Sequence, residues 1–403
     1  MHHLQQRTIK KLISAQIGAG LGTSSTVAAG SLLVTSITGS EKLAGLAQTF
    51  SVLGAAALAI PLARLTSQAG RRGALSMGYS TGVIGSLVAI LGGVHRNVAM
   101  MFIGSFLVGA ASASAYQARF AAIDLADEKH RARQLSLVVW GSTVGAVLGP
   151  NLMQPAGTIA EHFHLPKLVG PYMISALTLT FAATLIFLFL KPDPYLTARA
   201  ESGIIQKAQQ NTRAALSHIS KNPIALFAIL TIAMGHVAMV SVMVMTPVHM
   251  AHVDVSLRII GLVISVHVIG MYALSPLVGT ISDRLGQKTT IHIGFLILIC
   301  SAIVSGTARA DNVVQLGIGL FLLGFGWSFT LIAGSALLSL SVDLELKTSS
   351  QGASDLVMNL AAAIGGALAG VIIAALSYGW LCFFAAIPIL ILGLWSIRLH
   401  PIK

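Results

Sequence analysis

The sequence predicts an all-α membrane protein with twelve transmembrane helices in two pseudo-symmetric halves of six. Of its 403 residues, 55% are hydrophobic and only 9% are charged, and the mean hydropathy is +0.82. A soluble fold of this length would carry far more charge, about 25% in an ordinary domain. Long apolar runs recur along the chain, and loop motifs correspond between its halves. Composition therefore excludes a soluble enzyme, a nucleic-acid binder and a disordered scaffold.

Twelve apolar runs approach the length of about 20 residues that one membrane crossing needs. Their many glycines, 40 in the whole chain, are tolerated in membrane helices and allow close helix contacts. The expected spans are 12–38, 43–66, 74–93, 98–121, 134–156, 168–190, 223–249, 256–281, 289–307, 312–338, 349–376 and 379–397.

The longest polar stretch follows the sixth run and divides the chain. It predicts a first half over 1–190, a cytoplasmic central loop over 191–222 and a second half over 223–403. With the N-terminus inside, the inner segments carry 19 of the 25 Lys and Arg residues and the outer segments carry 5. The positive-inside rule then places both termini in the cytoplasm. The net charge of +12 thus indicates topology and contact with membrane lipid, and no nucleic-acid partner is expected.

Two loops repeat one motif at corresponding positions of the halves. The loop after the eighth span reads GxxxDRxGxK from Gly279 to Lys288, and the loop after the second span, residues 61–72, is a degraded copy. In that copy Ala63 replaces the first Gly, and Ser67 and Gln68 replace Asp and Arg. The pattern resembles the signature of the major facilitator superfamily over the whole chain. The resemblance implies a secondary transporter with parallel repeats.

The loop charges form candidate gating contacts at the inner side. We expect Asp283 and Arg284 to hold the inner gate shut in one conformation, and Arg71 or Arg72 to meet Asp124 at the inner end of the fourth span. The alternative is that these are solvated loop charges.

Few acidic residues lie inside the expected spans. Only Asp355 lies clearly within one, so the sequence offers little for proton coupling. Arg119 is expected to form a structural ion pair with Asp124 or to contact lipid. Ser105 stands where drug–proton antiporters of the superfamily carry an Arg, which disfavours that class.

Methionine and histidine concentrate in spans seven and eight. Residues 234–271 hold six Met and four His, where an even spread of the 13 of each would give about one of each. Met239 and Met243 form one i, i+4 pair, and His267 and Met271 form another, so each pair shares a helical face. Counted from a turn near residue 253, Met239 and His267 lie at similar depth, as do His236 and Met271.

Thioether sulfur and imidazole without carboxylate form a soft ligand set that suits copper, chiefly Cu(I). His236 is a possible additional ligand. The outer end of the seventh span carries His249, Met250 and His252, which we interpret as a possible entry site. The alternative there is an ordinary amphipathic helix end.

The cluster also resembles the CcoA-type bacterial copper importers of the superfamily, which supply copper for cytochrome oxidase assembly. The resemblance implies that Met239, Met243, His267 and Met271 bind copper as a transported substrate in the bacterial cytoplasmic (inner) membrane. It implies periplasmic or cytoplasmic copper chaperones as partners, a monomer and no tightly bound cofactor. The family's cysteines in this region are missing, since the two Cys residues are Cys300 and Cys382.

Two other functions remain open. A related branch includes riboflavin transporters, so the cluster is alternatively the sulfur-rich pocket wall of an organic-solute or drug transporter. A transport-inactive sensor or assembly factor is a third hypothesis, which the short tails disfavour. No nucleophile–base set or phosphate loop indicates an enzyme.

Overall fold

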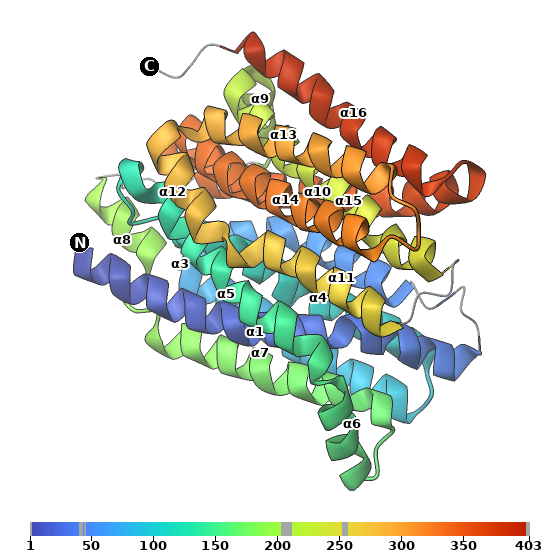
Figure 1. Ribbon diagram of the computed structural model, residues 1–403. Coiled ribbons are helices and arrows are strands. Elements are labelled where there is room, and N and C mark those ends of the chain that lie inside the picture. Colours follow the sequence, from blue (N-terminus) through green and yellow to red (C-terminus); the bar gives the residue numbers. More distant parts are fainter. Residues whose placement is uncertain (1, 40–42, 44–45, 203–211, 252–256, 400–403) are drawn as a thin grey trace. The chain divides into compact units, whose positions relative to one another are not determined.

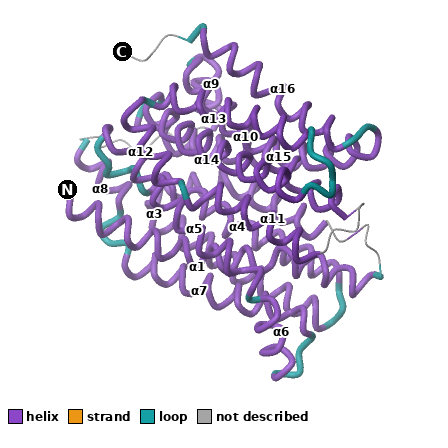
Figure 2. The backbone as a smooth tube through the Cα atoms, viewed as in Figure 1, coloured by secondary structure: helices purple, strands orange, loops and turns teal. Residues whose placement is uncertain are grey.

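The structure is a computed structural model that describes residues 2–39, 43, 46–202, 212–251 and 257–399. Helices and their connections make up these ranges, and no strand occurs in them (Figure 2). The helices in chain order are α1 (His2–Thr38), α3 (Leu46–Val94), α4 (Val98–Ala121), α5 (Arg131–Asn151), α6 (Met153–His162), α7 (Gly170–Phe189), α8 (Pro194–Glu201), α9 (Thr212–Lys221), α10 (Pro223–Ala251), α11 (Leu257–Val268), α12 (Ser275–Leu285), α13 (Gln287–Gly306), α14 (Val313–Ser341), α15 (Leu344–Ala375) and α16 (Tyr378–Ile397), with the short turns η1 (Glu128–His130), η2 (Lys167–Val169) and η3 (Ile269–Ala273).

The described helices cover the predicted spans but divide them differently, and the count of twelve spans stays a prediction. Ten helices in the described ranges are long and apolar enough to cross a membrane, and the pair α5 and α6, bent by 61°, makes an eleventh candidate. One of the ten, α3, covers both the second and the third predicted spans in 49 residues. It breaks at Gly70 (φ 79°, ψ 178°), a left-handed conformation that glycine adopts at little cost. The all-α prediction is confirmed.

Contacts divide the chain into two units. The first contains Met1–Ala126, Gly141–Thr212 and Leu344–Leu356, and the second contains Asp127–Trp140, Arg213–Asp343 and Val357–Lys403. The first unit therefore includes the start of α15, and the second includes the start of α5. Inside the first unit, α1 packs along α7, and α3 packs along α4 and α7 (Figure 1).

The second unit is built around α14. This helix is apolar on all sides and packs against α10, α11, η3, α12 and α13, while α16 covers α10 and α13. A helix that is apolar all round is normally buried, and the side chains of α14 from Gly326 to Ser339 are buried without interruption. Side chains on α10, α11 and η3 therefore take their positions from α14.

Candidate functional site

Trp327 on α14 connects the two segments that carry the methionine–histidine cluster. Its indole Nε1 donates a hydrogen bond of 2.9 Å to Nδ1 of His236 on α10. Its ring also meets the ring of Tyr272 in η3 edge to face, with centroids 5.6 Å apart. Because Nδ1 of His236 accepts this bond, that nitrogen is occupied and the proton of a neutral ring lies on Nε2.

His267 is held in the opposite tautomer. The side chain is fully buried, and its Nδ1 lies 2.7 Å from the backbone carbonyl oxygen of Leu320 on α14. A carbonyl oxygen can only accept, so Nδ1 carries the proton, and in the neutral ring Nε2 carries the lone pair. Nε2 is buried and has no hydrogen-bond partner among the described residues. In its neutral form the side chain thus presents an oriented, buried imidazole nitrogen with an available lone pair.

Met271 follows His267 through an irregular turn. Residues 269–273 form a π-helical turn, η3, between α11 and α12, where the sequence suggested one continuous helix face. Single π-turns inside helices occur often at functional sites. Gly324 on α14 allows the close approach here, because a Cβ at this position would meet the His267 carbonyl oxygen and lie 3.0 Å from Met271 Cγ.

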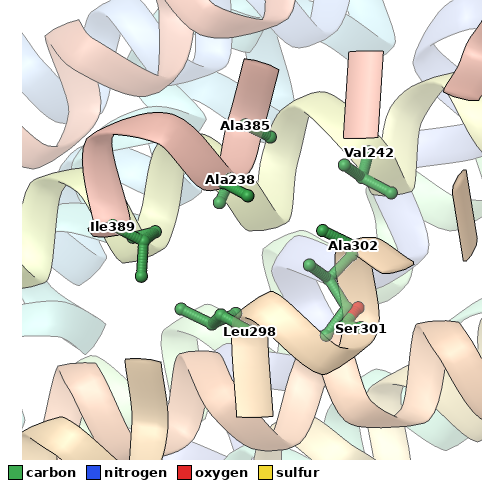
Figure 3. Close-up of a pocket in the computed structure, with 9 residues that line it drawn as sticks. Ala238, Val242, Leu298, Ser301, Ala302, Ala385 and Ile389 are labelled. Atoms are coloured by element: carbon green, nitrogen blue, oxygen red, sulfur yellow. The ribbon is translucent and has the colours of Figure 1, made fainter. Parts of the chain in front are cut away.

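Met239 and Met243 lie on the face of α10 that also carries His236. Met239 is only 4% exposed, and Met243 is partly exposed. A different face of α10, with Ala238 and Val242, lines a small apolar space against α13, α14 and α16 (Figure 3). The methionine pair therefore does not belong to that apolar space.

The hydrogen bond between His236 and α14 sets the depth of the methionine pair. Because α10 and α14 run in opposite directions, Met239 lies near the level of Met271, and Met243 near the level of His267. This pairing is shifted by about one turn from the predicted one, which counted outward from an assumed turn between the helices. The four predicted ligands thus occupy two neighbouring levels of the second unit.

The predicted entry residues at the end of α10 have partners of their own. The ring of His249 stacks on that of Tyr378 with centroids 4.3 Å apart, and Met250 is buried. His252 lies outside the described residues. In the described part of the chain, no three His, Cys, Asp or Glu side chains form a group that could hold a metal ion. A copper site here would therefore depend on thioether ligands.

The carboxylate of Asp283 accepts hydrogen bonds from the start of a helix. The sequence had suggested that it acts together with the basic side chain of Arg284. Its two oxygens accept hydrogen bonds of 2.9 Å each from the backbone N–H groups of Ala132 and Arg133, in the first turn of α5. These donors have no partner within their own helix, and a negative charge complements the helix dipole there. Arg284 is exposed at the end of α12.

Arg71 meets Asp124, as predicted. Its Nε donates to one carboxylate oxygen at 2.7 Å, and a terminal nitrogen lies 3.2 Å from the other. That terminal nitrogen also donates to Gln351 on α15 at 2.7 Å. Ser67, which replaces the acid of this loop, bonds only locally to the carbonyl oxygen of Arg64 in the contacts described.

Arg119 has a partner that the sequence analysis missed. Its guanidinium donates to Asp355 on α15 at 2.6 Å, and both side chains are at most 2% exposed. The two residues are 236 positions apart, and the prediction considered only the nearby Asp124. The available signal was that Arg119 and Asp355 both lie inside expected spans near the inner side.

Comparison with known proteins gives matches over nearly the whole chain. The Major Facilitator Superfamily matches residues 12–256 and 237–403. The "uncharacterized MFS-type transporter YddS" of Bacillus subtilis is 35% identical over 399 residues, covering 97% of this chain and 90% of that one. The riboflavin transporter RfnT of Brucella anthropi is 25% identical, covering 97% and 96%. The crystal structure of the human organic anion transporter MFSD10 (TETRAN) has the same fold, with a TM-score of 0.77 at 16% identity and coverage of 97% and 99%.

Proposed function

Because the chain belongs to the Major Facilitator Superfamily of membrane transporters, we propose that it is a secondary-active importer of copper. The ion is bound as Cu(I) by Met239, Met243, His267 and Met271, and it reaches the cytoplasm by alternating access. The protein lies in the bacterial inner membrane with both termini in the cytoplasm, and the imported copper serves cytochrome oxidase assembly.

The observation that carries this proposal is the tautomer of His267. Metal-binding histidines almost always donate their second ring nitrogen to a carbonyl or carboxylate, which fixes the ring and raises the basicity of the ligand atom. The bond from Nδ1 to the Leu320 carbonyl oxygen has this form. The opposite nitrogen is buried, and thioethers lie at the levels of His267 and the next turn. Imidazole with thioethers favours Cu(I) over hard cations.

An organic solute such as riboflavin is the second candidate. It is supported by the resemblance to the riboflavin transporter RfnT across 97% of this chain. In that case Met239 and Met243 would form part of an adaptable pocket wall, and the buried His267 would serve packing alone.

Transport also requires that the inner side open and close. In our proposal the Asp283 contact with the start of α5, and the Arg71 contact with Asp124 and Gln351, hold the inner side shut. Copper can favour opening only through interactions that differ between the two conformations. Because the proposed site has only four ligands, the loss of any one of them should reduce the difference in copper affinity between the two conformations.

Uptake measurements test the proposal. Cells with and without the gene are given radioactive copper with ascorbate, and parallel cells are given labelled riboflavin. We expect gene-dependent copper uptake, reduced by about tenfold or more in each of Met239→Leu, Met243→Leu, His267→Leu and Met271→Leu, as losses of metal-site residues commonly cause. Met-to-Leu changes conserve volume, so the protein should remain in the membrane at normal levels.

Met101→Leu is the matched control, because Met101 is fully buried in the core of the first unit. Its copper uptake should equal that of the wild type. Normal copper uptake by both Met243→Leu and His267→Leu would contradict the copper site. Gene-dependent riboflavin uptake without copper uptake would establish the second candidate in its place.

A further inference from the structure

The ion pair between Arg119 and Asp355 is almost fully buried. Nη2 of Arg119 lies 2.6 Å from Oδ1 of Asp355, with side-chain exposures of 2% and 1%. The arginine is further fixed by a 2.8 Å bond to the Tyr116 carbonyl oxygen and by the Phe120 ring, 4.4 Å from its Cζ. Removing two charges from water costs several kcal/mol each, so close pairing is what makes the burial tolerable.

The described surroundings of Asp355 contain cationic groups and a phenol. The charged or titratable groups facing it include Arg119 and Tyr116 on α4, and Arg71 on α3. Arg71 has its own carboxylate, Asp124, at 2.7 Å. Asp355 is the carboxylate that pairs with Arg119 at 2.6 Å. A proton added to it leaves a buried guanidinium without a counter-charge.

The ion pair between Arg119 and Asp355 attaches the start of helix α15 to the first unit. The start of α15, Leu344–Leu356, belongs to the first unit, whereas the remainder, from Val357, belongs to the second. Asp355 lies in the last turn of the first-unit segment, one turn after Gln351, which accepts from Arg71. The start of α15 is thus attached to the first unit by two buried arginines, Arg71 and Arg119.

We propose that Asp355 is the proton-binding site of the transporter, and that protonation breaks its contact with Arg119 and releases the start of α15 from the first unit. The step adds one proton to a carboxylate and gives a neutral carboxylic acid. The uncompensated guanidinium then favours a conformation in which water reaches it, because an unpaired buried charge is strongly unfavourable. The assignment makes the proton the coupling ion for whatever solute is carried, and it does not rest on copper being that solute.

A buried thiol on α15 reports the release without any substrate. In full-length protein reconstituted in liposomes, Cys300 is changed to Ser and Cys382 to Ala, and Ser350, fully buried beside Gln351, is changed to Cys. Maleimide labelling is measured in a pH series, and each rate is divided by the rate for denatured protein at the same pH, because the thiolate is the reacting species. We expect the normalised rate to rise about tenfold between about pH 8 and about pH 5.

Three variants separate proton binding from simple loss of structure. Asp355→Asn should label rapidly at every pH, because Arg119 is then always uncompensated. Arg119→Gln combined with Asp355→Asn removes both charges and should return to slow, pH-independent labelling, which a misfolded protein would not do. Asp311→Asn, a change in an exposed pair with Arg309, should behave as the wild type. A flat wild-type series, a pH response that survives in Asp355→Asn, or rapid labelling of the double variant would each overturn the proposal.

Discussion

At the scale of single residues, two buried histidines of the second unit are fixed in opposite tautomers by their partners. His267 donates from Nδ1 to a carbonyl oxygen, whereas His236 accepts at Nδ1 from the Trp327 indole. The first leaves a lone pair on Nε2, and the second places a proton there. The composition of the cluster indicated a metal site, but it could not rank these two histidines, because tautomers depend on partners that are distant in the sequence.

Trp327→Phe tests the role of the indole donor. The change leaves the buried Nδ1 of His236 without that hydrogen bond, which should lower the free energy of unfolding by about 1–3 kcal/mol. Copper uptake should fall less than in His267→Leu, since His236 is not among the four proposed ligands. Thermal unfolding and initial uptake rates provide the two measurements. Trp380→Phe is the control, because Trp380 is 50% exposed and should show almost no loss of stability. Equal stability of both variants would contradict the structural role of Trp327.

At the scale of elements, apolar run length predicted the helices well, and local breaks were harder to predict. The positions of the spans follow from composition, because a membrane admits few other structures for such runs. The break in α3 at Gly70 lay within a loop that the repeated motif had marked. The π-turn η3 was not predicted, since its sequence reads as an ordinary helix and the contact with Gly324 on α14 shapes it from outside.

Gly324→Ala should disturb the cluster through packing alone. The added Cβ would meet the His267 carbonyl oxygen and the Met271 backbone and side chain, so α11 and η3 must move away from α14. We expect a lower thermal midpoint and reduced copper uptake. Gly317→Ala on the same helix is the matched control, because nothing lies within 4 Å of its Cβ and alanine favours helix by up to about 1 kcal/mol. Similar behaviour of the two variants would show that the Gly324 contact does not position the site.

At the scale of the whole molecule, the repeated loop motif indicated the Major Facilitator Superfamily, and the family match confirms it. The division into six-helix halves at 190 and 223 stays a prediction. The sequence predicted only some of the contacts that the loop charges make. Arg71 and Asp124 were predicted to meet because both were expected at the inner side of the membrane, and the structure pairs them. The partners of Asp283 were not predicted, because they are backbone N–H groups, which every residue except proline carries. The partner of Arg119 was not predicted either, because Asp355 lies 236 positions away in the sequence.

Asp283 and Asp355 hold different helix starts, so their effects should be separable. Asp283→Asn removes the charge at the start of α5 and should weaken that contact, since an amide retains one acceptor oxygen but not the charge that complements the dipole. We expect slower transport of any solute and a higher labelling rate of the Ser350→Cys reporter at every pH. The rise in labelling with acid should persist, because Asp355 and Arg119 are intact. Unchanged labelling together with full transport would remove Asp283 from the gate, and a lost pH response would mean that both carboxylates belong to one proton-sensitive contact.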